Sequence, residues 1–490
     1  MIYIDRSSKI PIYRQIYEQI RGDIIDGTLG EGSRLMSIRS LANNICVARN
    51  TVEYAYAQLS LEGYVQNKAC SGFVVQKIDR SFFTNAHSKI DDKLLHYSSS
   101  SIPCNSNVGL PGDMLAWINN ELGLYEYDFQ CTGITREVFP HAIWRKLTNE
   151  TLRANDNYKI GIYNDMQGEA DLRNEIMLYL NRSRDVHCTA DQIVMCSGIR
   201  NALDIVCKLL SDRVERFAVE EPTNYCTRAV IENSVYKIAP VVVNEDGISI
   251  RELKRSSADA VFVTPSHQFP TGVVMSIQNR IQLLDWAIQN NTVVIEDDYD
   301  SELRYHTGPI PSLQSIDKHG RVIYMGTFSK ALSPDLRMAY MILPEWILSK
   351  YYSMFAMYRS TLSWFQQRVL CQFMKEGYWE RHIQKLCHVN RIKHDALIRT
   401  IKSLMGDRVT IRGANAGTHL ILEFPGGEEQ KWLTSRAKEF GVKVYPITPF
   451  WYNKEKCPQN QLLIGFNMLD EKQIIRGVSL LNKAWFEADT

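Results

Sequence analysis

Three features that often reveal the partners of a protein are scarce in this sequence of 490 residues: a charge excess, a long apolar run and paired cysteines. Lysine and arginine number 56 and aspartate and glutamate 55, so the net charge is +1 and any binding to nucleic acid has to come from a local patch. No apolar run is long enough to span a bilayer, and Met1–Arg6 does not resemble the start of a secretory signal. We therefore expect a cytoplasmic protein that does not enter a membrane.

The cysteines are scattered and odd in number. There are 11 of them, and no two form a Cys-x-x-Cys pair. This pattern argues against a disulfide framework and against a zinc site, and it is typical of reduced thiols in the cytoplasm. What the chain does have is length and apolar content. With 45% hydrophobic residues it can bury a full-sized core, and its length predicts two or three domains.

The N-terminal part carries three helical patterns followed by a hairpin pattern. Isoleucines recur every four positions after Pro11, and a second apolar pattern begins behind Ser37, a residue type that caps helices. A third pattern, Val52–Leu59, follows closely, and two short amphipathic helices joined so tightly are typical of a helix-turn-helix. The segment Tyr64–Val75 then predicts two strands around a glycine turn. From periodicity alone, a small helical bundle that binds another protein fits equally well.

An apolar strand that ends in acids lies further along the chain, in Thr292–Asp300. The carboxyl ends of parallel strands are where α/β proteins place their ligands. An acid at such a place can pair with a protonated pyridine nitrogen, as pyridoxal 5'-phosphate (PLP) requires. Taken alone, Glu296–Asp298 also fits a solvated acidic turn.

A second stretch, Arg321–Tyr340, has the residue types expected around a lysine that reacts with a cofactor. A buried-strand pattern gives way to small hydroxyl residues and then to Lys330 in a nearly uncharged setting. Desolvation lowers the pKa of a lysine in such a setting, and a neutral amine can form a Schiff base with an aldehyde cofactor. Thr327 and Arg337 are suited to hold a phosphate beside it, the arginine as a two-pronged donor. A lone lysine is more often a solvated loop residue, but the two stretches in this order favour the cofactor.

The segments Glu296–Tyr305 and Gly326–Arg337 resemble the MocR/GabR family of transcription regulators, and Gly32–Ala42 with Ala48–Leu59 resemble its GntR-type DNA-binding module. The resemblance implies a multidomain protein. Residues 1–76 would form a winged helix-turn-helix (α+β), and 128–490 an α/β fold-type I aminotransferase-like domain whose small C-terminal part begins near residue 405. Between them, over 77–127, the apolar pattern lapses and serine, glycine and proline crowd together, which predicts a linker with one short helix over Met114–Leu122. It also implies a homodimer that binds double-stranded DNA.

The same resemblance assigns roles around PLP. Lys330 would form the Schiff base, Asp297 would pair with the pyridinium nitrogen, and Tyr299 would bond the phenolic oxygen. Thr327 and Arg337 would bind the phosphate. The remaining expected cofactor contacts are the backbone of Ile199 and Arg200 at a helix start, Tyr225 on the ring, Gln268 near the ring, and Tyr163 from the partner subunit. Phe269 and Asn224 depart from the family, which usually has asparagine and an aromatic residue at these positions.

The expected DNA contacts cluster around the second and third helical patterns. By the match to GntR modules they are Arg39, Arg49, Asn50 and Thr51, with Lys68 on the wing. Met36 stands where the family usually has proline. Because the segment is barely basic, one module alone should bind DNA modestly, and a dimer that presents two modules would compensate.

The effector is open at this stage. Aminotransferases commonly bind the substrate carboxylate through an arginine of the last domain, and Leu463 stands at the matching position. Three options remain: a carboxylate held by Arg228 or Arg412, an amine without a carboxylate, or PLP itself as the signal. The function we expect is a PLP-dependent transcription regulator. A working aminotransferase and a plain DNA-binding repressor are the alternatives.

Overall fold

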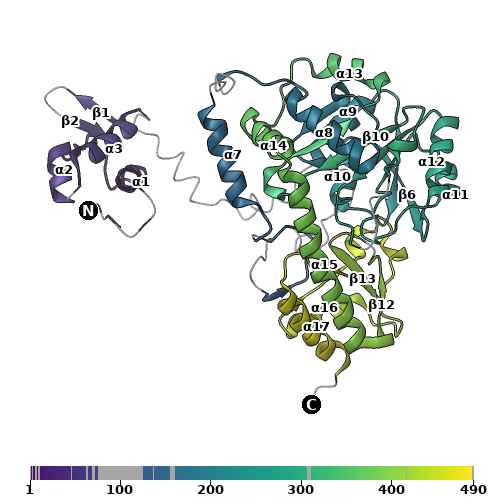
Figure 1. Cartoon of the computed structure of the whole chain (residues 1–490). Coiled ribbons are helices and arrows are strands. Elements are labelled where there is room, and N and C mark those ends of the chain that lie inside the picture. Colours follow the sequence, from purple (N-terminus) through teal and green to yellow (C-terminus); the bar gives the residue numbers. More distant parts are fainter. Residues whose placement is uncertain are drawn as a thin grey trace. The chain divides into compact units, whose positions relative to one another are not determined.

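The computed structural model of the chain contains two compact units, residues 1–110 and 111–490. Figure 1 shows the elements of each unit. The residues that the structure describes are 2, 4, 5, 8, 11–45, 47–61, 64–68, 72–75, 125–135, 137–154, 161–305, 311–414 and 416–487. The helix expected over Met114–Leu122 and nearly all of the expected linker 77–127 lie outside these residues.

The first unit is a winged helix-turn-helix. Its elements are α1 (Ile12–Ile25), α2 (Ile38–Asn44), α3 (Arg49–Leu61), β1 (Val65–Lys68) and β2 (Gly72–Val75). Ile16, Ile20 and Ile24 of α1 are buried in one cluster with Leu41, Val52 and Leu59 of the next two helices. Ser37 caps α2 as predicted, because its side chain accepts a hydrogen bond from the Ser40 amide at 3.1 Å. Strands β1 and β2 pair antiparallel and form the wing, so the predicted fold of this module is confirmed.

The second unit is built on a mixed sheet. The strand order is β4-β11-β10-β9-β8-β5-β6-β7, in which β10, β9, β8, β5 and β6 run parallel and β11 is antiparallel to both neighbours. The strands are β4 (Ile193–Cys196), β5 (Arg216–Glu221), β6 (Lys237–Asn244), β7 (Gly247–Ile248), β8 (Ala260–Val263), β9 (Val293–Asp298), β10 (Val322–Thr327) and β11 (Ala339–Ile342). The predicted α/β architecture is confirmed by this sheet and the helices that connect its strands.

Helices cover both faces of this sheet, since alternate strand residues enter different cores. Along β10, Ile323 and Met325 belong to the core that includes α9, whereas Val322 and Tyr324 belong to cores on the opposite face. The helices are α7 (His141–Arg153), α8 (Ala170–Arg184), α9 (Ile199–Leu210), α10 (Tyr225–Asn233), α11 (Ile250–Arg255), α12 (Ile277–Gln289), α13 (Glu345–Phe355), α14 (Trp364–Lys375), α15 (Tyr378–Met405), α16 (Gln430–Glu439) and α17 (Glu471–Phe486).

The C-terminal part adds a small antiparallel sheet of order β12-β13-β16-β15. Its strands are β12 (Thr410–Arg412), β13 (His419–Glu423), β15 (Tyr445–Pro446) and β16 (Gln461–Gly465), while β14 (Val442–Lys443) pairs instead with β3 (Tyr127–Asp128). The segment Val442–Pro446 is therefore divided between two sheets. Residues of both parts share one core, so the small part is not an independent unit.

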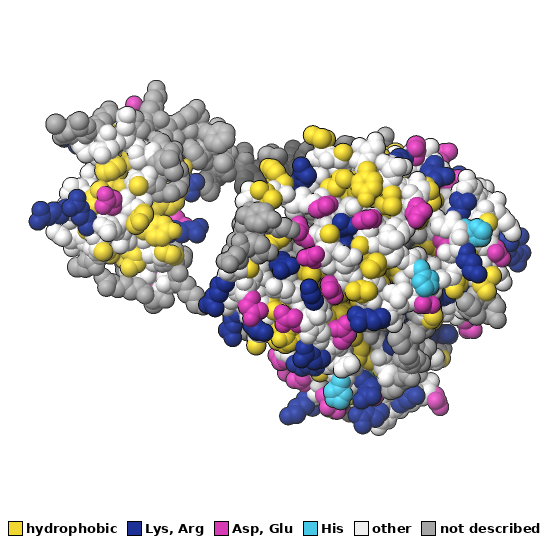
Figure 2. All heavy atoms as spheres, turned by 45° about the horizontal axis from the view of Figure 1, so that its top comes forward, with side chains coloured by type: hydrophobic (Ala, Val, Ile, Leu, Met, Phe, Trp, Pro, Cys, Tyr) yellow, Lys and Arg dark blue, Asp and Glu magenta, His cyan; other side chains and the backbone are white. Residues whose placement is uncertain are grey.

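On the face of the large unit that Figure 2 shows, acidic and basic side chains are intermixed, in keeping with a net charge of +1. No helix in the part of the chain that the structure describes has both the length and the apolar character needed to cross a membrane.

Candidate functional site

The three acids at the end of β9 have different surroundings, because successive side chains of a strand point to opposite faces of the sheet. Glu296 is fully buried, and its carboxylate accepts hydrogen bonds from the amides of Leu313 (2.8 Å) and Gln314 (2.9 Å). Asp298 lies on the same face and forms an ion pair with Arg184. Asp297, between them, points to the opposite face. Two of the acids are therefore structural, and only Asp297 is left for a ligand.

Asp297 is a buried carboxyl with an unused oxygen. The residue is 7% exposed, and its Oδ1 has no hydrogen-bond partner among the described residues. Burial, followed by the charges of Asp298 and Asp300, raises the pKa of Asp297 well above its usual range. A buried polar atom without a partner calls for an explanation, and a protonated ring nitrogen of a cofactor supplies one. The carboxyl thus fits the pyridinium nitrogen of PLP.

Lys330 follows β10 in a half-buried turn. Its Nζ donates a hydrogen bond to the backbone carbonyl of Cys131 at 2.5 Å. That carbonyl also accepts a hydrogen bond from the Thr418 hydroxyl at 3.3 Å. The contact fixes where the amine lies, and it could not be predicted, since a backbone acceptor 199 positions away leaves no signal in the sequence.

The predicted phosphate residues gather around the start of α9. Gly198, in the left-handed region with φ 92°, is the N-cap, and a Cβ placed on it would overlap the guanidinium of Arg337. Arg337 itself has φ 51°, and its Nη2 lies 3.5 Å from the Ser197 carbonyl. Ile199 and Arg200 form the first turn, where amides have no partner within the helix and favour an anion.

Thr327, at the end of β10, is already engaged. Its Oγ1 lies 3.0 Å from the Ser329 hydroxyl and 3.2 Å from the Met338 carbonyl, next to Arg337. The structure therefore brings Thr327 to the same corner as Arg337. Its role toward the phosphate remains a prediction.

Tyr299 belongs to a buried polar cluster with His267 and Asp300. The Nδ1 of His267 lies 2.8 Å from Asp300 Oδ2 and 3.1 Å from the Tyr299 hydroxyl. Burial, then Asp300 and Asp297, raise the pKa of Tyr299, so its hydroxyl stays protonated and able to donate. His267 Nε2 has no partner among the described residues. The sequence singled out Tyr299 but missed Asp300, which follows the strand and has the pattern of a turn residue.

Two side chains that the sequence placed near the ring have other contacts. The amide of Gln268 is engaged at both ends: Nε2 donates to the Pro222 carbonyl at 2.7 Å, and Oε1 accepts from the Thr271 hydroxyl at 2.6 Å. Tyr225 packs on Phe450 with ring centroids 6.1 Å apart. Asn224, the unusual neighbour of Tyr225, caps α10 by accepting from the Cys226 amide at 2.9 Å.

The two candidate effector arginines are both engaged. Arg228 donates to the Trp451 carbonyl at 3.2 Å, and its guanidinium lies 5.5 Å from the ring centroid of Tyr452. Arg412 forms a two-pronged ion pair with Glu423 and lines a cavity of about 920 Å³. Neither has a contact with Lys330 or Asp297 in the described part of the chain. Tyr163, expected to reach a partner subunit, is 83% exposed.

Four of the five expected DNA contacts belong to α2 and the first turn of α3 in the first unit. Arg39 is exposed on α2, while Arg49 and Asn50 are exposed and Thr51 half-buried on the first turn of α3. Lys68 is the last residue of β1. The first turn of α3 therefore presents a compact group of donors for base edges or phosphates.

The buried carboxyl of Glu220, at the end of β5, should make the stability of the fold depend on pH. It is 1% exposed and accepts hydrogen bonds from the Thr264 hydroxyl (2.6 Å) and amide (3.1 Å), and burial raises its pKa from 4.5 to about 7. The folded state therefore holds this proton at pH values where the unfolded state has lost it, so the free energy of unfolding should fall as the pH rises through that window. In Glu220→Gln, the decrease in the free energy of unfolding over this pH range should be smaller by roughly 1 to 3 kcal/mol.

The measurement is the urea midpoint between pH 4.5 and 7, the limits set by the two pKa values, followed by tryptophan fluorescence. Glu150→Gln, an exposed glutamate on α7, is the matched control and should leave the pH dependence unchanged. An unaltered slope in Glu220→Gln would show that Glu220 is ionised throughout.

Comparison with known proteins supports both halves of this description. Residues 123–460 match the family model "Aminotransferase class I and II", and residues 12–75 match "Bacterial regulatory proteins, gntR family". An uncharacterized HTH-type transcriptional regulator of Bacillus subtilis (strain 168), YdeL, is 35% identical over 99% of this chain and 98% of its own. The probable rhizopine catabolism regulatory protein MocR of Rhizobium meliloti is 29% identical over 100% of this chain and 97% of its own.

Among solved structures, the kynurenine aminotransferase of Pyrococcus horikoshii superposes with a TM-score of 0.69 at 23% identity. The match covers 82% of this chain and 98% of that one. At this identity the likeness shows the fold of the large unit.

Proposed function

Because this chain belongs to the MocR/GabR family of PLP-dependent transcription regulators, we propose that its large domain senses a small amine, or PLP itself, at the site around Lys330 and Asp297. The winged helix-turn-helix binds DNA, and the aminotransferase-like domain is of a PLP-dependent family. The observation that carries the sensing site is the buried, unpaired Oδ1 of Asp297 on the strand next to the one that leads to Lys330. The proposed place of action is the cytoplasm, where a bacterial regulator meets DNA.

In this proposal, different residues of the chain bind different parts of the cofactor. PLP supplies an aldehyde carbon to which a primary amine can bond. Lys330 provides the resident amine, held in place by the Cys131 carbonyl. Asp297 holds the proton of the ring nitrogen, and the Tyr299 hydroxyl donates to the phenolic oxygen. Arg337 and the first turn of α9 bind the phosphate.

Sensing is favoured over turnover by Leu463. It is fully buried and lies where aminotransferases commonly have an arginine for the substrate carboxylate. A homodimer is part of the proposal, with the exposed Tyr163 of each subunit reaching the phosphate held by the other. The proposed domains are 1–76, a linker 77–127, and 128–490 with its small part from about 405.

Arg49→Ala tests the DNA-binding half. Because the side chain is exposed on the first turn of α3, its loss should weaken DNA binding and reduce the slope of log affinity against log salt by about 1 if it contacts a phosphate. The measurement is fluorescence anisotropy with a duplex selected from random sequence by the unaltered full chain.

Arg14→Ala is the control for charge. Arg14 lies on α1, which carries none of the predicted contacts, and pairs with Glu18 at 2.9 Å, so its variant should bind as the unaltered chain does. If Arg14→Ala weakens binding as much as Arg49→Ala does, the first turn of α3 does not contact DNA directly.

A further inference from the structure

The strand that would carry an arginine in an aminotransferase has a buried apolar residue at that position. Leu462 and Ile464 of β16 belong to the large core, whereas Leu463, between them, lies on the other face of the strand. There it stands opposite Ile421 of β13 and Tyr445 of β15. The side chain at position 463 thus belongs to a separate cluster, which also contains Cys131, Ile447 and Phe450 and which we call the apolar wall.

The apolar wall borders the amine of Lys330. Cys131 is part of the wall, and its carbonyl is the acceptor for Lys330 Nζ. Phe269 and Tyr225 pack against the same cluster, and Phe269 meets the Phe450 ring edge-on at 4.9 Å. A ligand that reaches Lys330 from this side therefore meets hydrocarbon and aromatic surface, on which a carboxylate would lose its hydration without gaining a partner.

The two arginines that the sequence offers for a carboxylate both have other partners. Arg412 gives two of its donors to Glu423, and Gln461 donates to the same carboxylate at 2.9 Å. Arg228 bonds the Trp451 carbonyl and lies 3.9 Å from Glu232. To bind either arginine, a ligand carboxylate would have to replace its present hydrogen bonds and ion pair. Hydrogen bonds to charged groups are among the stronger ones in proteins.

His419 adds no positive charge. It is 2% exposed, and its ring centroid lies 5.1 Å from that of Phe269 and 5.0 Å from that of His267. Burial, then His267 and Lys330, lower the pKa of His419 well below its usual value, so the imidazole is neutral. Its Nε2 has no partner among the described residues. A neutral ring nitrogen suits a neutral polar group or an N–H donor better than a carboxylate.

We propose that the effector accepted beside Lys330 is a primary amine whose substituent is apolar and uncharged, and that the apolar wall around Leu463 excludes amino acids. The inference rests on the proposed function, in which PLP occupies the site. Of the three effector classes that the sequence leaves open, the inference selects the amine without a carboxylate.

The test is calorimetric titration of the PLP-loaded full chain with three probes that share one phenyl group. These are 2-phenylethylamine, L-phenylalanine and L-phenylalaninamide, which has the size of the amino acid without its negative charge. We expect the amine and the amide to bind at least about tenfold more tightly than the amino acid, because only the amino acid brings an unpaired charge to the wall. Equal or tighter binding of L-phenylalanine overturns the inference.

Leu463→Arg and Leu463→Met complete the design. The arginine variant should shift the preference toward L-phenylalanine by about tenfold or more, whereas the methionine variant should keep the original order. If the arginine variant does not fold, the comparison of the three probes on the unaltered chain still decides. A chain that holds PLP but binds none of the probes refutes the inference and leaves PLP as the signal. A chain that takes up no PLP refutes the proposed function instead.

Discussion

Lys330→Ala is expected to yield a folded protein without the visible absorption of a PLP Schiff base. Lys330 is half-buried and donates a hydrogen bond to the Cys131 carbonyl, so its amine is held in one place after β10, the strand that pairs with the strand of Asp297. Alanine removes the amine that would bond to the cofactor, and with it the hydrogen bond to the Cys131 carbonyl. We expect the apparent Kd for PLP to rise by roughly 100-fold or more, which corresponds to about 3 kcal/mol. Phosphate and ring contacts would remain, since Arg337 and Asp297 are untouched.

The measurement is the visible spectrum after gel filtration, before and after borohydride reduction, with protein and variant compared at equal concentration. Lys385→Ala, an exposed lysine on α15, is the matched control and should keep the full band. A band of full intensity in Lys330→Ala would show that another lysine holds the cofactor. Lys393 would then be the next candidate, because burial lowers its pKa to about 8 and it donates to the Asn467 carbonyl.

The strand pattern of the sequence was sufficient to predict β9 and β10 and the position of Asp297 and Lys330 near their ends. It could not say which of three consecutive acids faces the site. That choice depends on the register of β9, where Glu296 and Asp298 share one face and Asp297 has the other. Only the structure shows that Glu296 anchors the backbone at Leu313 and that Asp298 is paired.

The partners of the site residues were the least predictable. Cys131 contributes a carbonyl, which every residue has, and His419 begins a strand of the small part, far from the other site residues in sequence. Gln268 was expected near the ring, but its amide bonds the hydroxyl of Thr271 and, on a distant segment, the carbonyl of Pro222. Contacts made between distant segments, or with backbone atoms, leave little trace in residue type.

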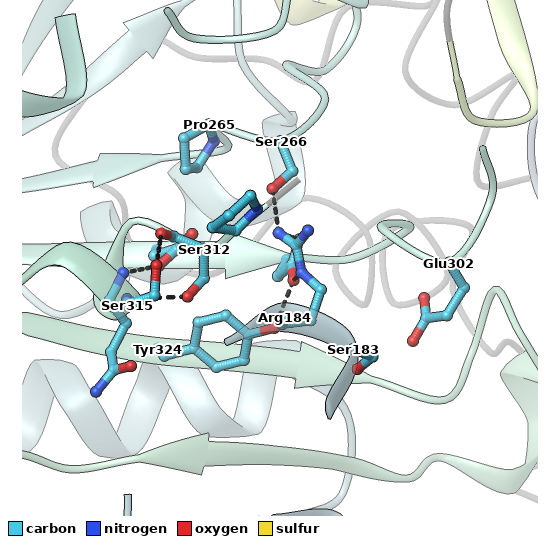
Figure 3. Close-up of polar contacts among 12 residues, drawn as sticks. Ser183, Arg184, Pro265, Ser266, Glu302, Ser312, Ser315 and Tyr324 are labelled. Carbon is cyan, nitrogen blue, oxygen red and sulfur yellow. Dashed lines mark hydrogen bonds and ion pairs between the residues drawn. The ribbon is translucent and has the colours of Figure 1, made fainter. Parts of the chain in front are cut away.

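Arg184, at the end of α8, was not singled out in the sequence either, although it is central to the sheet beneath the site. Its Nε lies 2.8 Å from Asp298 Oδ2, with side chains that are 3% and 1% exposed. Its Nη2 donates to the Ser266 hydroxyl at 2.5 Å, and the Tyr324 hydroxyl donates to the same aspartate. Figure 3 shows the guanidinium of Arg184 near Ser266 and Tyr324. A buried arginine at a helix end gives no pattern that distinguishes it from an exposed one.

Arg184→Met should therefore destabilise the large unit strongly. The substitution leaves Asp298 charged, buried and without its ion-pair partner, a change that typically costs about 3 to 5 kcal/mol. Tryptophan fluorescence in urea measures the effect selectively, because all nine tryptophans lie in residues 111–490. Arg182→Met is the matched control. Arg182 lies on the same helix, but its pair with Glu380 is 67% and 43% exposed, so its loss should cost no more than about 1 kcal/mol.

The double variant Arg184→Met with Asp298→Leu separates the ion pair from the packing around it. Removing both charges should recover much of the lost stability, since the cost of Arg184→Met lies mainly in the charge left behind. If the double variant is as unstable as the single one, packing and the Ser266 contact carry the effect instead. The uncompensated Asp298 of the single variant should also raise the pKa of Asp297 further, because the two carboxyls already repel each other. PLP binding should then weaken in Arg184→Met and recover in the double variant, which would tie the ion pair beneath the sheet to the charge of the carboxyl in the site.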